Sequence, residues 1–440
     1  MNKFYKRQKM NFKYFLYIFF SIFLLNSCSE NNTKKNVPLI YWSSNNNGEI
    51  IFSKKMVNQW NKQHPENIIK FQPVPEGQSS EEMILAAVVG KTTPDIYSNM
   101  WQGSVEFYAK SHVLIALDTL VGFNEFIHTR CDSSTIKEVT SSDGHIYQIP
   151  WKINPIMTLY NKGLFSSLKQ DSLPQTYSSY LNAAKKFKKD INGDGYVDQW
   201  FGNTSVKVVW YQQLFNFYTL YIAASDGLPL VKNNKACFNN KYAIEVFRFL
   251  QDLYKNNYFS KDQKSAGADP FIARQVATKF TGPWEIKHLE KFKPENFEYD
   301  FFPIPVPDNH KGPIYTYCDP KNIVIFNTCK NPQLAFQFIK TMIDKKGDLK
   351  FIETTGQLPR RYGIDTIKDY ENYFKENPKL KIFAKQTKYI KGIDNCEVIT
   401  EVLDIISQEY EACVLYDMKS PEKAIGDADK AVNVLLRTKN

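Results

Sequence analysis

The 440-residue sequence has little of the chemistry on which many enzymes and metalloproteins depend. Its six histidines never recur at H-x-x-x-H spacing, its seven cysteines form no C-x-x-C pair, and no G-x-S-x-G motif occurs. The stretch from Val89 to Thr92 matches only the end of a phosphate-binding loop, because Leu85 stands where the first glycine belongs and a helix precedes it. No acidic pair can be assigned to glycosidase geometry from the sequence. These absences argue against zinc, redox, serine-hydrolase and nucleotide chemistry.

The sequence also has little excess charge. Five of its ten net positive charges lie in the first 13 residues, so the rest carries only +5, too little to predict a nucleic-acid partner. With 43% hydrophobic, 15% aromatic and 23% charged residues, the chain is neither disordered nor a coiled coil as a whole. Its length is enough for two or three domains with sizeable cores.

The N-terminus has the pattern of an export signal. A basic head, Met1 to Lys13, precedes an apolar run, Tyr14 to Leu25, which is too short to span a membrane comfortably as a helix. Leu25 to Cys28 resembles the bacterial lipoprotein signal, in which the cysteine is cut free and lipidated, with palmitate as one of the acyl chains. We therefore predict a signal peptide at 1–27, lipidation of Cys28, a tether at 28–36, and a body held by lipid at the cell envelope, on its periplasmic side or at the cell surface. The alternative is an ordinary cysteine beside a membrane anchor.

The pairing of the other cysteines stays open. Disulfides are possible in an exported chain, and free buried thiols are the alternative. These residues are Cys131, Cys237, Cys318, Cys329, Cys396 and Cys413.

Strand and helix patterns alternate from Pro38 onward. Strands are predicted at 39–42, 68–73 and 94–97, with helices at 51–62 and 81–89 between them and a polar turn at 43–48. This βαβαβ order predicts a parallel sheet with helices on its faces. Further along, helices are predicted at 180–188, 241–254 and 332–343, and over nearly all of 380–435.

Several segments, in order, resemble the extracellular solute-binding proteins of ABC importers, the maltose-binding-like family 1 that mostly carries sugars. The most specific is Asp143 to Phe165 (DGHIYQIPWKINPIMTLYNKGLF), which looks like the family's "Asp-Gly-x-x-Tyr-x-x-Pro" and "x-Tyr-Asn-x-x-Leu-Phe". The other matching segments are 39–75, 86–117, 271–284 (FIARQVATKFTGPW), 331–343, 355–360 (TGQLPR) and 422–435. Arg274 departs from the family pattern, where a glycine is usual.

The resemblance implies an α/β fold of two lobes, of the type II periplasmic-binding-protein kind, with a ligand cleft between the lobes and a helix-rich C-terminus. Lobe 1 is expected at 37–152 plus 315–350, and lobe 2 at 155–302 plus 360–440. The chain is expected to cross between them near 151–155, 302–315 and 344–359. Several prolines in these segments suit connectors, because proline fixes φ and limits strand pairing.

A sugar site needs aromatic platforms and a few fixed polar groups, with little need for charge. Such groups are expected beyond the carboxyl ends of the strands. Tyr317 and Asp319, with Lys321, stand where the family has small residues and would add side chains near the cleft, so ligand identity cannot be carried over. Trp284 is the strongest candidate, because Gly282 and Pro283 place it on a turn and the family's matching tryptophan often stacks on ligand; core packing is the alternative for each tryptophan. The predicted ligand-binding residues are Trp42, Ser43, Ser44, Asn99, Trp101, Trp151, Asn154, Trp210, Trp284, Tyr317, Asp319 and Arg360.

The segment DINGDGYVDQWF resembles a calcium loop. Phe201 replaces the bidentate glutamate expected at the twelfth position, so only weak structural calcium is predicted, and an Asx-rich turn without an ion is the alternative. The predicted ligands are Asp190, Asn192, Asp194, Tyr196 and Asp198. No other cofactor is expected.

The function predicted from these features is capture of an oligosaccharide or related small solute by a lipid-anchored binding protein, expected to be a monomer, that delivers it to the transmembrane subunits of an ABC permease. No catalysis is expected. One alternative is a secreted carbohydrate-active enzyme. Another is a sensor or surface capture lipoprotein that takes no part in transport.

Overall fold

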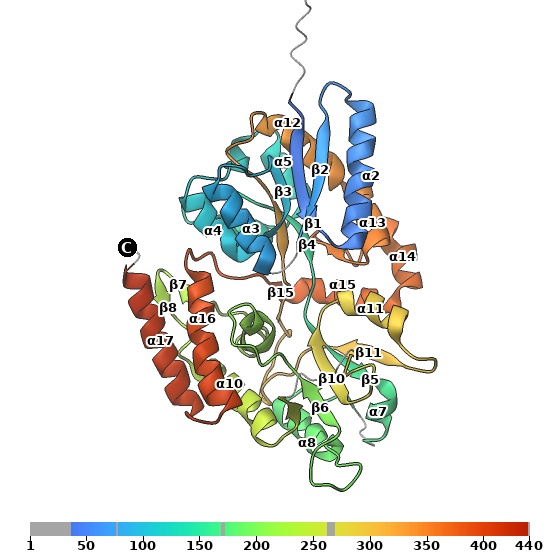
Figure 1. The fold of residues 1–440 in the computed structure, drawn as a ribbon, viewed down its shortest axis with the longest axis vertical. Coiled ribbons are helices and arrows are strands. Elements are labelled where there is room, and N and C mark those ends of the chain that lie inside the picture. The colour runs from blue at the N-terminus through green and yellow to red at the C-terminus, as the bar shows by residue number, and fades with distance from the viewer. Residues whose placement is uncertain (1–36, 76–77, 169–171, 262–268, 439–440) are drawn as a thin grey trace, which may run out of the picture.

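The structure is a computed structural model that describes residues 37–75, 78–168, 172–261 and 269–438. The predicted signal peptide, tether and lipidated Cys28 lie outside these residues. The described chain forms two halves, each built around its own sheet and drawn one above the other in Figure 1. No helix in the described residues combines the length and apolar character needed to cross a bilayer.

The first sheet is mixed. β1 pairs in parallel with β2 and β3, as the βαβαβ order predicts, whereas β13 runs antiparallel to β3 and β4, and β14 antiparallel to β4. Its order is β14 (Leu358–Pro359), β4 (Ile149–Ile153), β13 (Lys321–Ile325), β3 (Ile96–Trp101), β1 (Leu39–Ser44) and β2 (Ile69–Val74). Around it lie α2 (Asn47–Gln63), α3 (Gln78–Val89), α4 (Gln102–Lys110), the turn Leu117–Thr119, α5 (Phe123–Arg130), α6 (Ser133–Val139), α12 (Pro332–Met342) and α13 (Lys345–Thr355).

The second sheet is smaller and surrounded by more helix. Its order is β11 (Tyr299–Phe302), β5 (Met157–Asn161), β10 (Val276–Thr281), β6 (Trp200–Asn203) and β9 (Phe259–Ser260). A hairpin, β7 (Val231–Lys232) and β8 (Lys235–Ala236), lies beside α17. The helices of this half and of the junction are α7 (Lys162–Ser166), α8 (Tyr177–Phe187), the π-helical turn Leu214–Tyr218, α9 (Thr219–Ala224), α10 (Lys241–Lys255), α11 (Trp284–Phe292), the turn Lys368–Tyr370, α14 (Glu371–Glu376), α15 (Pro378–Gln386), the turn Thr387–Tyr389, α16 (Ile399–Tyr410), the π-helical turn Glu411–Leu415 and α17 (Pro421–Thr438).

The two halves are joined where separate stretches of chain lie side by side. Residues 154–156 connect β4 to β5, and there the Asn154 amide donates to the Cys318 carbonyl (2.6 Å). The Cys318 amide donates in turn to the Lys391 carbonyl (3.0 Å), beside the short parallel pair β12 (Thr316–Tyr317) and β15 (Ile390–Lys391). Within the third crossing, predicted near 344–359, α13 packs on α2 and β14 pairs with β4. The exact lobe boundaries stay predictions.

Helix α2 begins four residues before its predicted start. The Asn46 side chain accepts hydrogen bonds from the amides of Gly48 and Glu49 and so caps the helix at its first turn. Strand β1 also continues through Ser44, with both serines buried. The predicted polar turn at 43–48 is therefore only two residues long, and this brings the start of α2 to the edge of the sheet.

The described cysteines all carry free thiols. Cys237 is exposed and the other five are buried. Burial favours the reading of the five buried cysteines as small core side chains.

Gly202 in β6 is packed too closely for any larger residue. A Cβ there would lie 2.5 Å from the Phe259 ring and 2.8 Å from Thr278 Oγ1. We expect Gly202→Ala to lower the free energy of unfolding by about 1–3 kcal/mol through overpacking, measured by urea denaturation. Gly426→Ala is the matched control, because nothing lies within 4 Å of its Cβ and alanine favours the helix there. Equal urea midpoints for the two variants would contradict the packing argument.

Candidate functional site

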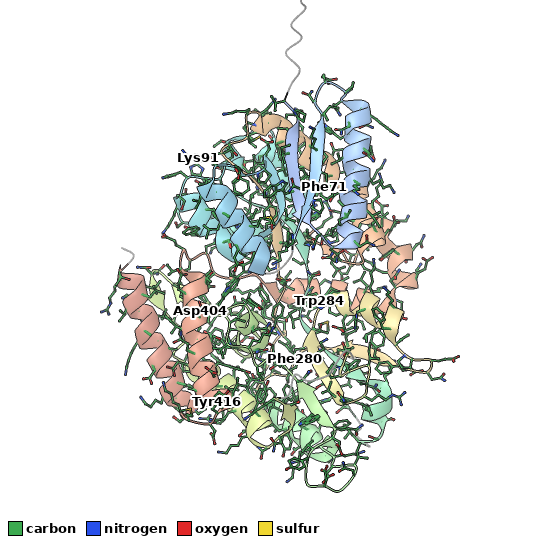
Figure 2. The ribbon with its side chains drawn as sticks, in the orientation of Figure 1. Phe71, Lys91, Phe280, Trp284, Asp404 and Tyr416 are labelled. Atoms are coloured by element: carbon green, nitrogen blue, oxygen red, sulfur yellow. The ribbon has the colours of Figure 1, made fainter. Side chains whose placement is uncertain are left out.

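A cavity of about 580 Å³ lies between the two halves. It is bounded on one side by the ends of β3 and β4, the start of β13 and the first turn of α2, and on the other by the π-helical turn at 214–218 and the start of α11. Figure 2 shows Trp284, at the start of α11, where the halves meet. The cavity therefore lies beyond the carboxyl ends of parallel strands, where open α/β sheets bind ligands.

Strand alternation decides which side chains reach the cavity. Asn99 and Trp101 are two residues apart at the end of β3 and both line it, as do Lys152 and Asn154 at the end of β4. Trp151 faces the other way and packs on Phe351, with ring centroids 5.0 Å apart. The predicted ligand role of Trp151 is therefore not supported, because the strand turns its indole into the core.

Aromatic side chains from both halves line the cavity. The rings of Trp101 and Trp210 are 4.7 Å apart at a tilt of 41°, so residues distant in sequence meet across the cavity. Phe215 meets Trp284 edge to face at 6.3 Å. Trp101 is only 2% exposed, whereas Trp284 is 40% exposed and open to a ligand. Trp101 is thus a fixed, buried part of the aromatic lining, whereas the exposed Trp284 ring can stack on a flat apolar face of a ligand.

Of the predicted ligand-binding residues, half line the cavity and half do not. Those that line it are Asn99, Trp101, Asn154, Trp210, Trp284 and Asp319. Asn154 Oδ1 is buried and has no hydrogen-bond partner among the described residues, so it is an acceptor that a ligand hydroxyl can satisfy.

The other predicted residues support the site from behind or lie in the core. Tyr317 accepts a hydrogen bond from Trp101 Nε1 (3.0 Å) and so fixes that indole. Arg360 is buried and donates to Glu138 (2.8 Å) and to Gln102 Oε1 (3.3 Å). Ser43 accepts from Ser98 Oγ, Ser44 Oγ accepts from the Asn46 amide, and Trp42 packs in the core cluster around β3. None of these side chains lines the cavity.

The cavity also contains charged groups: Asp319 and Lys321, which the sequence analysis placed near the cleft, and Lys152, which it missed. Lys152 forms a buried ion pair with Glu49, which also accepts from Gln357 Nε2 (2.8 Å). Lys321 lies 3.5 Å from Asp319. Because neighbouring side chains of a strand point to opposite sides, the position of Lys152 next to Trp151 could have predicted that one of the two faces the cavity. The ion pair between Lys152 and Glu49 could not have been predicted, because it depends on the tertiary fold.

Two further ionisable groups line the cavity, and protein packing shifts both pKa values. Burial raises the pKa of Glu81, whose carboxylate accepts from Ser104 Oγ (2.7 Å). Partial burial lowers the pKa of Lys287, whose ammonium donates to the Thr354 carbonyl (3.0 Å). Lys287 follows Trp284 by three residues on α11, so helical spacing from a candidate platform could have identified it.

The predicted calcium loop is exposed and internally hydrogen-bonded. Asp190 accepts from the amides of Gly193 (2.7 Å) and Gly195 (2.8 Å), and Asp194 accepts from that of Tyr196 (2.8 Å). Asp198 accepts from the Ile191 amide (2.7 Å). These contacts form Asx-type turns that also bring side-chain oxygens together. Calcium binding here stays a prediction.

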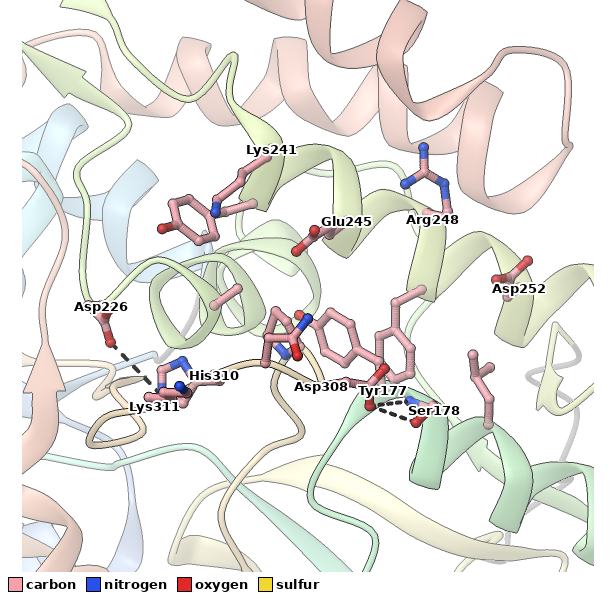
Figure 3. A pocket seen from close by; sticks show the side chains of 16 residues that line it. Tyr177, Ser178, Asp226, Lys241, Glu245, Arg248, Asp252, Asp308, His310 and Lys311 are labelled. Atoms are coloured by element: carbon pink, nitrogen blue, oxygen red, sulfur yellow. Dashed lines mark hydrogen bonds and ion pairs between the residues drawn. The ribbon is translucent and has the colours of Figure 1, made fainter.

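A second cavity of about 530 Å³ lies within the second half, between the start of α8, α10 and residues 307–311 (Figure 3). Its walls carry many charges of both signs. Asp308 accepts from Ser178 Oγ (2.6 Å), and His310 faces Asp226 at 3.9 Å. No tryptophan lines it, and it lies away from the strand ends that meet at the first cavity. The cavity between the halves is therefore the candidate site.

Comparison with known proteins identifies the family. Residues 55–381 match the model of the bacterial extracellular solute-binding protein family. An arabinooligosaccharide-binding protein of Bacillus subtilis (strain 168) is 25% identical over 228 residues, which are 49% of this chain and 47% of that protein, so the match spans about half of each.

Solved structures share the fold over nearly the whole chain. An uncharacterized protein of Listeria monocytogenes EGD-e is 27% identical, with a TM-score of 0.79 over 91% of this chain and 99% of that one. The cyclic alpha-maltosyl-1,6-maltose binding protein of Arthrobacter globiformis is 19% identical, with a TM-score of 0.77 over the same shares. The predicted two-lobed α/β fold class is thereby confirmed. The family match covers more than half of the sequence, and the chain belongs to the bacterial extracellular solute-binding proteins.

Proposed function

We propose that this protein captures a carbohydrate, an oligosaccharide or a related small solute, in the cavity between its lobes and delivers it unaltered to an ABC permease. The observation that carries the proposal is the cavity wall of tryptophans beside the unpartnered carbonyl oxygen of Asn154. Indole faces suit the C–H faces of sugar rings, and fixed amides suit their hydroxyls. The arabinooligosaccharide-binding relative supports the same ligand class.

Closure of the lobes provides the affinity in this proposal. Both the Trp101–Trp210 contact and the Lys287–Thr354 hydrogen bond join elements of the two halves across the cavity. A ligand that contacts both walls binds the closed form better than the open form, so it shifts the population toward closure. The closed form is then the state that a permease would recognise.

Lipid attachment at Cys28 forms part of the same proposal. A tether from Cys28 to Asn36 would hold the body near the membrane, where a permease can receive the ligand. The basic head, the apolar run and the cysteine position in the sequence support this attachment.

A thermal-shift and calorimetric screen of the mature chain, residues 28–440, against neutral and acidic mono- and oligosaccharides tests the proposal. A sugar present at about 100 times its dissociation constant is expected to raise the free energy of unfolding by about 2.7 kcal/mol. Mass analysis of the sugar after overnight incubation is expected to show no product. Turnover would favour the secreted enzyme, and failure of every carbohydrate to stabilise the protein would contradict carbohydrate capture.

A further inference from the structure

Resting on the proposed function, we propose that the captured carbohydrate is acidic: a sugar carboxylate binds the Lys287 ammonium while its ring stacks on Trp284. The two side chains are three residues apart on α11, and both line the cavity. Residues at this spacing share one face of a helix, with Cβ atoms about 5–6 Å apart. An indole platform and a cation are thus presented together by one rigid element.

Lys287 differs from the other cations that line the cavity. Lys152 is paired with Glu49, and Lys321 with Asp319 at 3.5 Å. Within the described chain, by contrast, no carboxylate forms an ion pair with Lys287. Its ammonium donates to a single carbonyl, that of Thr354 at 3.0 Å, so two of its three N–H groups can still be donated to a ligand.

The acidic residues of α11 itself are engaged elsewhere. Glu285 accepts from Lys279 (3.1 Å) and from Thr281 Oγ1 (3.0 Å). Glu290 accepts from Lys293 (2.8 Å) and from the Tyr299 hydroxyl (2.7 Å). Neither carboxylate is therefore held in position to neutralise Lys287.

The remaining acids of the cavity do not supply a counter-charge to Lys287 either. Asp319 is paired with Lys321, the Glu81 carboxylate accepts from Ser104 Oγ (2.7 Å), and neither forms an ion pair with Lys287. Among the described residues, Lys287 is thus left without a carboxylate partner at the site where a ligand would bind.

Closing the lobes would bury the Lys287 ammonium further, so its lack of a carboxylate partner would affect which ligand binds. Trp284 and Lys287 are both exposed in the present conformation, and partial burial already lowers the pKa of Lys287. Closing the lobes over a neutral sugar would remove more water from an ammonium that has only a backbone carbonyl as its partner, which is costly. A sugar carboxylate would replace that water with a charge-assisted hydrogen bond. The cavity therefore favours an acidic over a neutral sugar of the same shape.

A structural role is the alternative for Lys287. Its stem passes over Gly356, which ends α13 in the left-handed conformation (φ +69°), and its ammonium lies near the negative end of that helix. A residue that only capped α13 would influence the stability of the unliganded protein but not the choice between acidic and neutral sugars. Ligand selectivity is therefore the readout that separates the two roles.

The test uses pairs of sugars that differ in a carboxylate, namely oligogalacturonates against galacto-oligosaccharides of equal length, and xylo-oligosaccharides with and without a glucuronate branch. Calorimetry of the mature chain is expected to show the acidic member of at least one pair binding ten-fold or more tighter, with a preference that weakens as salt is added. Lys287→Met is expected to weaken acidic binding by ten-fold or more and to change neutral binding by less than three-fold.

Lys291→Met is the matched control. Lys291 is an exposed lysine of the same helix that does not line the cavity, so the same charge change there should alter neither affinity. If the neutral sugar bound as tightly as the acidic sugar in every pair, the proposal of an acidic ligand would be wrong. The proposal of carbohydrate capture would not be affected. A preference for acidic sugars that persists in Lys287→Met would overturn the role of this lysine. Failure of all the sugars in both screens would instead contradict the proposed function itself.

Discussion

Replacing Asp348 by alanine is expected to lower the free energy of unfolding by about 3–5 kcal/mol, because it leaves two buried guanidinium groups without a counter-charge. Asp348 Oδ2 accepts from Arg130 Nη1 (2.8 Å) and from Arg361 Nε (2.6 Å). The Arg130 and Asp348 side chains are fully buried, and that of Arg361 is only 5% exposed. Urea denaturation of the mature chain measures the effect as a lower midpoint.

This cluster matters for the fold because it joins segments that are far apart in sequence. Arg130 also donates to the carbonyls of Pro150 and Ile343, and Arg361 donates to those of Thr129 and Ile343. It therefore ties the end of α5, the strand β4 and the end of α12 to the start of α13.

Asp369→Ala is the control for this prediction, because Asp369 is an exposed aspartate whose loss removes the same charge from the surface. That variant is expected to unfold within about 0.5 kcal/mol of the wild type. A similarly small change for Asp348→Ala would show that the two arginines find other partners or water when the carboxylate is removed.

The local elements of the fold could be predicted because each is specified by nearby residues. The short β-rich run at 39–42 predicts β1. The helical spacing of Phe52, Met56 and Trp60 predicts α2, whose buried face they form. The start of α2 was missed because Asn46 acts through a hydrogen bond to the backbone rather than through hydropathy. The antiparallel β13 could not be placed from local pattern, because its partners β3 and β4 precede it by more than 150 residues.

The aromatic part of the site was partly predictable, whereas of its charged part only Asp319 and Lys321 were expected near the cleft. Tryptophans at predicted strand ends are conspicuous, yet only the strand register separates Trp101, which lines the cavity, from Trp151, which packs in the core. The pairs Lys152–Glu49 and Asp348–Arg130 join residues more than 100 positions apart. Such pairs are created by the tertiary fold, and a single sequence carries no local signal for them.

Trp284→Ala is expected to weaken binding of the tightest sugar found in the screen by about 30-fold, or about 2 kcal/mol, which is the scale of a central aromatic contact in an interface. Trp284 is the exposed indole of the cavity wall and would become buried when the lobes close on the ligand. Its exposure also means that its loss should barely change the stability of the unliganded protein. Calorimetry and urea denaturation of the same variant measure the two effects separately.

Phe292→Ala supplies the matched comparison, because Phe292 is an exposed aromatic at the far end of the same helix and does not line the cavity. That variant should bind the sugar as the wild type does. Trp101→Ala would be a poorer test, since Trp101 is buried and hydrogen-bonded to Tyr317, so its loss would disturb packing as well as binding. If Trp284→Ala and Phe292→Ala bound with equal affinity, the ligand would not stack on α11. That result would contradict the proposal that Trp284 and Lys287 bind one acidic sugar together.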